Sequence, residues 1–350
     1  MARGRLDNNI NLLRLLAASA VVVAHCAPVA YGPHVGSPAK GWLGVSLGEA
    51  AVHVFFLLSG LLVARSAMEK DFRQFAAARL RRIYPGMIAC TLATVLVAGL
   101  FLTNLSPAEF FAEPLTVWHL LKNLTLFTGV AYSLPGVLET NPYGGVVNGS
   151  LWTISLEIQM YAFLAVIVAA ARLCAKRVPQ AALAALCAAL ALTPVLLVTT
   201  AIPGLQMPVA RCILFFLIGA FVHAHWGGRI PRPRWFVVAG AVLLLWSETR
   251  LIGYTMLLPP IVIWLAYAAS PVGRPWARWP DLSYGIYLYG FPVQQTVKAL
   301  LPGAGAWGVF WVTALVLVPI ATMSWYWIES PFLRSRSAKR PARSPIAEVA

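Results

Sequence analysis

The chain has 350 residues, of which 59% are hydrophobic and only 11% charged. Because a soluble domain usually carries about 25% charged residues, this composition excludes a protein with a large soluble core and indicates a membrane protein. The net charge of +15 does not indicate nucleic-acid binding, because the basic residues form short clusters between apolar runs, as topology signals do. The five cysteines lie in or beside these runs without CxxC spacing, so neither a disulfide framework nor a metal site is expected.

Ten apolar runs approach the length of about 20 residues that a helix needs to cross a bilayer. They cover residues 10–29, 44–64, 87–105, 148–170, 180–200, 209–226, 235–249, 251–270, 282–301 and 306–328. We therefore predict an all-α integral membrane protein, with a bundle of about ten transmembrane helices in residues 1–333. The seventh run is short, and only a tight turn separates it from the eighth. The segment 334–350 is basic and poor in aromatic residues, which predicts a disordered tail.

The positions of lysine and arginine predict the orientation of these helices. If the N-terminus is cytoplasmic, the segments on the cytoplasmic side hold 21 of the 27 basic residues. Because positive charge is enriched on that side of membrane proteins, both termini are expected in the cytoplasm. The first run carries Arg14 and has no convincing cleavage site of small residues, so we interpret it as an uncleaved span.

The first span carries two ionisable residues, Arg14 and His25. They are 11 residues apart, so on a helix they share one face and stand about 16 Å apart along the axis. With a cytoplasmic N-terminus, Arg14 lies near the inner end of the span and His25 near the outer end. The structural alternatives are snorkelling of Arg14 to the inner headgroups and an interfacial position for His25.

The second span carries Glu49 and His53, which are four residues apart and therefore close enough to interact. A carboxylate beside an imidazole is found in nucleophilic and acid–base catalytic sites. Two such neighbours can also simply satisfy each other's hydrogen-bonding groups in a packed bundle. The fourth span places Glu157 near mid-membrane, where an acid indicates a functional site. The structural alternative is a glutamate that only links neighbouring helices. The hydrogen-bonding side chains around it are Trp152, Ser155, Gln159 and Tyr161. So many ionisable groups in a charge-poor bundle predict a cavity filled with water or substrate.

Two segments between the spans carry further signals. The inner segment after the second span contains Arg79 and Arg82, which are three residues apart and share one face of a helix. Such a pair suits a phosphate or pyrophosphate, while enrichment of positive charge on the inner side is the simpler explanation. The long outer segment 106–147 contains an apolar stretch, 117–134, which we expect to form an interfacial helix or a re-entrant piece.

Six motifs in order resemble the membrane-bound acyltransferase family 3, integral-membrane O-acyltransferases that modify sugars and other exported molecules. They are LLRLLAASAVVVAH, AVHVFFLLSGLLVARS, FAAARLRRIYPGM, SLWTISLEIQMY, DLSYGIYLYGFPVQQ and WYWIESPFLR. Many members have an acid where His53 stands. Many also have Trp-His where Tyr289 and Gly290 stand, so no catalytic role is assigned to Tyr289 and Gly290. The resemblance covers nearly the whole chain.

The resemblance implies that acyl-CoA, with acetyl as the expected acyl group, binds from the cytoplasm. The acceptor is expected to be a hydroxyl of a sugar, an exported polysaccharide or its lipid-linked precursor, in a bacterial inner membrane. No permanently bound cofactor is expected; acyl-CoA is a co-substrate, and membrane lipid is the other partner. His25 is the expected catalytic residue, as general base or transient acyl carrier, with Glu49 or Glu157 orienting it. Arg14, Arg79 and Arg82 are expected to hold the donor, and the supporting residues are His53, Ser59, Trp152, Ser155, Gln159 and Tyr161.

Two other functions fit the same buried charges. A transporter or flippase for a lipid-linked sugar lines its path with such groups, although no internal repeat is visible in the sequence. A non-catalytic membrane scaffold tolerates the loss of those charges. An acyltransferase consumes acyl-CoA, whereas a transporter ignores it.

Overall fold

The computed structural model describes residues 8–35, 38–174, 208–268 and 279–334. All regular structure within these ranges is helical, apart from one isolated bridge between Thr103 and Val137. The prediction of an all-α protein is therefore confirmed for this part of the chain. The predicted span 180–200 and residues 335–350 of the predicted tail lie outside it.

Seven helices in the described ranges are long and apolar enough to cross a membrane. They are α1 (Ile10–Tyr31), α3 (Leu47–Glu69), α4 (Phe72–Val97) with its π-helical end η1 (Ala98–Leu102), α7 (Leu151–Cys174), α9 (Pro208–Trp226), α11 (Arg250–Tyr267), and α14 (Ala306–Met323) with η2 (Ser324–Glu329) and α15 (Ser330–Arg334). Each overlaps one of the runs predicted to span. This is the architecture of a multi-pass membrane protein.

Two other predicted spans differ from these seven. The run 282–301 forms α13 (Ser283–Leu300), which is long enough to cross a membrane but has too many polar residues to be identified as a span. The run 235–249 forms only the 11-residue α10 (Pro233–Leu243), which is about 16 Å long against a hydrocarbon core of about 30 Å. Thr249 Oγ1 donates to Leu243 O at 2.8 Å and closes the turn that follows. The turn occupies the residues that a full span would need, so the full span is not confirmed.

The inner segment after the second span is helical instead of forming a long loop. α3 continues to Glu69, and α4 begins at Phe72, so the connection consists of only Lys70 and Asp71. Asp71 caps α4, because its carboxylate accepts a hydrogen bond from the Gln74 amide at 2.7 Å. The arginines of this segment consequently lie on a rigid helix.

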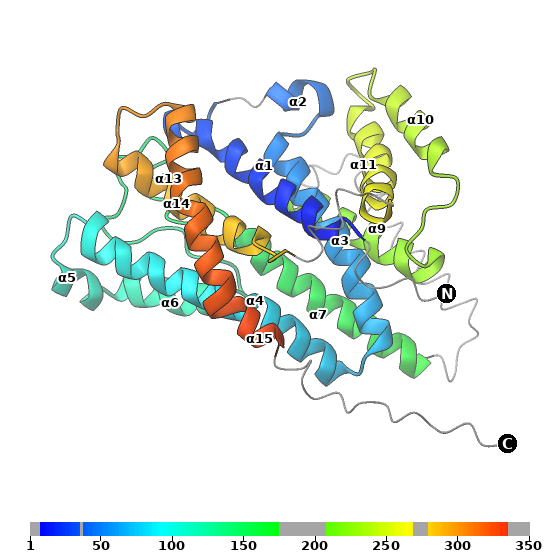
Figure 1. Ribbon diagram of the computed structural model, residues 1–350, viewed down its shortest axis with the longest axis horizontal. Coiled ribbons are helices and arrows are strands. Elements are labelled where there is room, and N and C mark those ends of the chain that lie inside the picture. The colour runs from blue at the N-terminus through cyan, green and yellow to red at the C-terminus, as the bar shows by residue number, and fades with distance from the viewer. Residues whose placement is uncertain (1–7, 36–37, 175–207, 269–278, 335–350) are drawn as a thin grey trace.

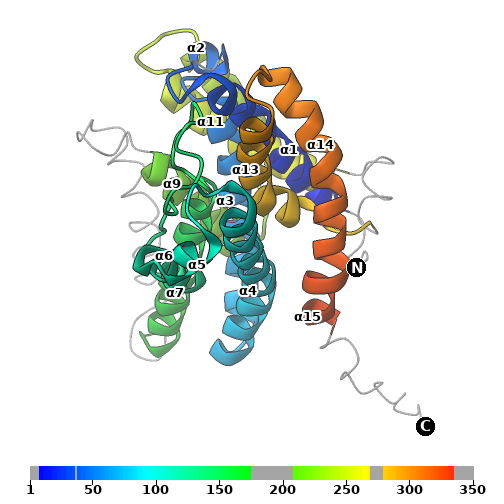
Figure 2. The ribbon, with the colours of Figure 1, turned by 90° about the vertical axis from the view of Figure 1, so that its left-hand side faces the viewer.

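The bundle is organised around α1 and α3. α1 packs against α3, α13 and α14, and Figures 1 and 2 show it near the middle of the molecule. The short α10 and α11 form a hairpin at one end, while α5 (Pro107–Ala112) and α6 (Pro114–Thr125) lie at the other (Figure 1). α2 (Pro38–Leu43) lies beyond the end of α1.

The outer apolar stretch 117–134 is helical only as far as Thr125, where α6 ends. Asn123 holds the following loop: its Nδ2 donates to Ala131 O at 2.8 Å, and its Oδ1 accepts from Ala131 N at 2.9 Å. The ring of His119 pairs with Ser133 O at 2.9 Å. A single continuous helix over 117–134 is therefore excluded.

The closest helix crossing is that of α3 with α9. A Cβ atom on Gly60 would lie 1.9 Å from Phe216 O, and one on Gly219 would lie 2.1 Å from Leu57 O. The two backbones therefore approach so closely that only glycine fits on either side, as in other membrane helix pairs built on small residues.

We expect Gly60→Ala to destabilise the protein by about 3 kcal/mol, because α3 and α9 must separate to admit the methyl group. Thermal unfolding in detergent measures the loss. Gly303→Ala is the matched control, because a Cβ atom there meets nothing within 4 Å. Equal melting temperatures for the two variants would contradict this description of the crossing.

Candidate active site

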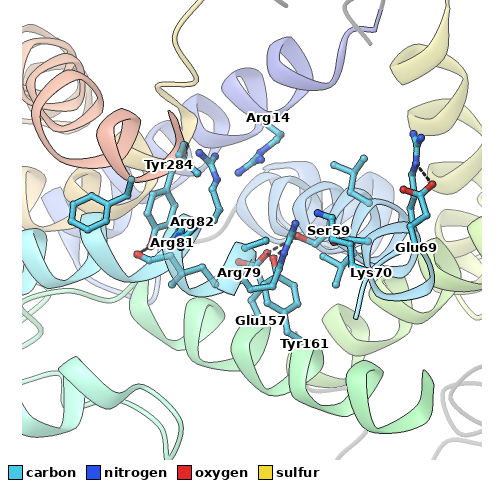
Figure 3. Close-up of a pocket in the computed structure, with 18 residues that line it drawn as sticks. Arg14, Ser59, Glu69, Lys70, Arg79, Arg81, Arg82, Glu157, Tyr161 and Tyr284 are labelled. Atoms are coloured by element: carbon cyan, nitrogen blue, oxygen red, sulfur yellow. Dashed lines mark hydrogen bonds and ion pairs between the residues drawn. The ribbon is translucent and has the colours of Figure 1, made fainter. Parts of the chain in front are cut away.

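A cavity of about 490 Å³, here called the inner cavity after the predicted orientation of the helices, lies between α1, α3, α4 and α7. Figure 3 shows Arg14 entering it from α1, Arg79 and Arg82 from α4, and Glu157 and Tyr161 from α7. The basic residues that line it are Arg14, Arg65, Lys70, Arg79, Arg81 and Arg82, against the acidic Glu69 and Glu157. This excess of positive charge suits a ligand with several phosphates.

Arg14 and Arg82 share one carboxylate at the edge of the inner cavity. Arg82 Nη2 donates to Asp281 Oδ2 at 2.6 Å, and Arg14 Nη1 lies 3.5 Å from the same oxygen. Burial alone would raise the pKa of the Asp281 carboxyl, but the two guanidiniums and the hydrogen bonds from Ser283 hold that pKa below its usual value. Asp281 therefore remains charged and ties α1 and α4 to the start of α13.

Arg79 and Glu157 form a second polar group in the inner cavity. Ser59 Oγ donates to Glu157 Oε1 at 2.5 Å, and the Tyr161 hydroxyl donates to the same oxygen. The Arg79 guanidinium lies over the Tyr161 ring, 5.7 Å from its centroid. The buried Arg79 Nε has no hydrogen-bond partner among the described residues, and an unsatisfied buried donor of this kind is typical of a functional site.

An outer cavity of about 900 Å³ contains His25. The His25 ring is half-buried and meets Phe291 edge-on at 5.2 Å. Glu49, His53 and Trp152 line the same cavity. In the described part of the chain neither Glu49 nor Glu157 is hydrogen-bonded to His25, so the orientation of the imidazole by one of these acids stays a prediction.

Glu49 and His53 interact with other helices rather than with each other. Glu49 Oε1 pairs with Arg211 Nη2 of α9 at 3.1 Å, and Glu49 Oε2 accepts from the Ser46 amide at 2.8 Å. His53 Nδ1 pairs with the Tyr254 hydroxyl of α11 at 2.9 Å. The expected contact between the two residues is therefore not formed, because ion pairing and capping already engage the carboxylate.

A third cavity of about 40 Å³, here called the neck, lies between the other two and shares lining residues with each. The residues that it shares with the inner cavity are Arg14, Glu157 and Tyr284. Those that it shares with the outer cavity are Val52, Thr153 and Tyr287. Shared lining residues therefore place the three cavities in a row from the arginines to His25. All five ionisable residues predicted within the spans line at least one of these cavities: Arg14, His25, Glu49, His53 and Glu157.

Comparison with known proteins shows which family the chain belongs to. A family model described as an acyltransferase domain matches residues 7–329. The chain belongs to the membrane-bound acyltransferase family 3. The acyltransferase is 28% identical over 345 residues to the "O-acetyl transferase" of Shigella phage Sf6, with 95% of this chain and 98% of the relative covered. It is 26% identical over 363 residues to "Nodulation protein 10" of Rhizobium leguminosarum bv. viciae, with 97% of each covered.

The family and the first of these relatives make the protein a membrane O-acyltransferase. The resemblance that the six sequence motifs predicted is therefore confirmed. No solved structure matches the acyltransferase at a significant level. Within the described residues, no group of three or more His, Cys, Asp or Glu side chains has an arrangement that could hold a metal ion.

The predicted supporting residues of the acyltransferase fall into two sets. Ser59 and Tyr161 hold Glu157, and Trp152 lines the outer cavity. Ser155 and Gln159 instead donate to the carbonyl oxygens of residues 126 and 127, the turn after α6. That turn contains a non-glycine residue at φ 54°, so these two side chains stabilise an unfavourable backbone conformation.

Three residues of the site were not predicted from the sequence. Asp281, Arg211 and Tyr254 were passed over because each lies far along the chain from its partner. One signal was available for Asp281: it directly begins the DLSYG motif and is the only acid in the basic stretch 271–281. Nothing in the sequence pairs Arg211 with Glu49.

Proposed function

We propose that the acyltransferase moves an acyl group, with acetyl as the expected one, from cytoplasmic acyl-CoA to a hydroxyl group of a sugar. The acceptor is an exported polysaccharide or its lipid-linked precursor, and both termini lie on the cytoplasmic side of a bacterial inner membrane. The observation that carries the proposal is the series of three cavities joining the arginine cluster to His25.

The donor end of the path is the inner cavity. Coenzyme A carries phosphates at one end and its thioester at the end of a long, thin arm. Arg14, Arg79 and Arg82 suit the phosphates, because guanidinium groups bind phosphate oxygens through paired hydrogen bonds. The arm then extends through the neck, which brings the thioester to the outer cavity.

The chemical step takes place beside His25. The imidazole accepts the proton of the acceptor hydroxyl, whose oxygen attacks the thioester carbonyl carbon. When the tetrahedral intermediate collapses, the carbon–sulfur bond breaks and the proton on His25 passes to the leaving thiolate. The products are an O-acyl ester and free coenzyme A. In this proposal Glu49 and Glu157 support the path by fixing its walls.

The acceptor end is the outer cavity. Its lining combines the aromatic rings of Trp152 and Tyr143 with the polar side chains of Lys40, His34 and Ser150. Aromatic faces with hydrogen-bonding groups around them suit a sugar ring, and about 900 Å³ lies within the usual range of ligand sites. The printed name of the phage relative, an O-acetyl transferase, supports an ester-forming reaction.

Reconstitution tests the proposal. The acyltransferase in proteoliposomes is given labelled acetyl-CoA on one side and a lipid-linked oligosaccharide acceptor in the membrane. We expect release of free coenzyme A thiol and labelled ester on the sugar. A transporter would move the labelled oligosaccharide across the bilayer without consuming acetyl-CoA, and that result would overturn the proposal. Mass spectrometry of surface glycans from a deletion strain identifies the natural acceptor.

We expect Arg79→Gln to raise the KM for acetyl-CoA by about 10- to 100-fold, with little change in kcat, because it removes a charge-assisted contact to the donor phosphates. Initial rates over a range of acetyl-CoA concentrations measure the change. Arg73→Gln is the matched control, since Arg73 is exposed in the first turns of the same helix. An unchanged KM in Arg79→Gln would remove this residue from the donor site.

A further inference from the structure

The neck is much smaller than the cavities on either side of it, about 40 Å³ against about 490 and 900 Å³. Its walls come from α1, α3, α7 and α13. If the donor phosphates stay at the arginines, the thioester reaches His25 only through this constriction. Every acyl group that is transferred must therefore first fit through the neck.

One side of the neck is fixed by Tyr287 of α13. Its hydroxyl forms a hydrogen bond with Thr153 Oγ1 at 2.5 Å and donates to Ser150 O at 3.4 Å. Tyr287 is 7% exposed, so moving the ring aside would cost its buried hydroxyl both hydrogen bonds. This wall therefore does not yield easily to a wider ligand.

A second side is formed by Phe55 of α3. Its ring meets the Tyr287 ring edge-on, with the centroids 5.5 Å apart, and the Arg14 guanidinium lies 6.0 Å from its centroid. Phe56 and Ile154 also line the neck and are 3% and 5% exposed, so the surrounding wall is closely packed. Because the walls are helical, the bulk of the Phe55 and Tyr287 rings sets the width of the neck.

We propose that Phe55 and Tyr287 select the acyl group by its width rather than by its length. This inference rests on the proposed function, in which the arm of coenzyme A enters the neck. A straight acyl chain is no wider than that arm and can follow the same path. A branched chain is wider by one methyl group, and a pocket discriminates against one such group by about 10-fold or more.

Butyryl-CoA and isobutyryl-CoA test the inference, because they are isomers that differ only in branching. We expect wild-type protein to prefer butyryl-CoA by about 10-fold in kcat/KM. In Phe55→Ala the preference should fall several-fold, because the rate with isobutyryl-CoA rises. Val52→Phe narrows the neck and should lose activity with butyryl-CoA before activity with acetyl-CoA. Any difference in intrinsic reactivity of the isomers is the same in every variant.

Phe163→Ala is the matched control, an identical truncation on the surface of α7, where Phe163 is 41% exposed. Its isomer preference should equal that of wild type. If Phe55→Ala does not fold, Phe55→Leu should show the same change to a smaller extent. Two results, each with normal acetyl transfer, would overturn this inference alone. One is a wild-type protein with no preference between the isomers, and the other is a preference in the Phe55 variants that equals that of wild type. No acyl transfer from any donor by wild-type protein would overturn the proposed function as well.

Discussion

Replacing His25 by glutamine is expected to reduce acyl transfer by a factor of about 10²–10⁴, the usual contribution of a general base. Glutamine retains hydrogen-bonding groups but does not accept the hydroxyl proton at neutral pH. Because the donor phosphates lie at the other end of the path, the KM for acetyl-CoA should change little. Initial rates of ester formation in proteoliposomes measure both parameters.

The control for this variant is His225→Gln. His225 is exposed at the end of α9, where it stacks on Phe221, and its replacement should leave the rate unchanged. Equal transfer rates for well-folded His25→Gln and wild type would reject the assignment of His25. Labelled acetyl recovered on His25 after a rapid quench would instead show that the imidazole carries the acyl group itself.

Replacing Asp281 by asparagine is expected to destabilise the acyltransferase by about 3 kcal/mol, because it leaves two partly buried guanidiniums without their shared counter-charge. The side chains concerned are only 10% to 23% exposed, so solvent screens the interaction weakly. Chemical unfolding in detergent measures the loss. Donor binding should weaken as well, since Arg14 and Arg82 are no longer held at the wall of the inner cavity.

A double variant distinguishes the loss of this ion-pair network from a nonspecific destabilisation of the fold. The double variant Asp281→Asn with Arg82→Gln should be less destabilised than the sum of the single variants, because the residues interact directly. Asp71→Asn is the isosteric control, since asparagine also caps a helix well. If Asp281→Asn and wild type unfold at the same denaturant concentration, the proposed network contributes no stability.

The pH dependence of this stability follows from the depressed pKa of Asp281. The contribution of its carboxylate is fully present above the unfolded-state pKa of about 3.9 and is lost as the pH falls through the lower folded-state value. The difference in stability between wild type and Asp281→Asn should therefore be constant from pH 8 to pH 5 and shrink below about pH 4. A difference that disappears near pH 6 would assign the effect to another group.

Local patterns explain why much of the fold could be predicted. A transmembrane helix satisfies its own backbone, so an apolar run of sufficient length is enough to locate it. Helical spacing also placed Arg14 and His25 on one face, and the structure has them at the inner and outer cavities. The failure at 235–249 has the same origin, because hydropathy does not reveal where a turn between two apolar segments ends a helix.

The partners of the polar residues could not be predicted in this way. Spacing identifies neighbours one turn apart, which suggested that Glu49 contacts His53. The structure instead pairs His53 with Tyr254, 201 residues away, and Arg82 with Asp281, 199 residues away. Such pairs depend on which helices cross and how closely, and that is decided by contacts such as Gly60 against Phe216.

From the order of residues alone, the chain could be identified as a helical membrane acyltransferase with ionisable groups at both ends of its first span. Those properties depend on composition, helical periodicity and short ordered motifs, all of which are local in the chain. The packing of the helices, by contrast, places the arginines and His25 at two cavities with a narrow neck between them. A cavity is the space left between helices that are distant in sequence, and its width depends on how their side chains pack together.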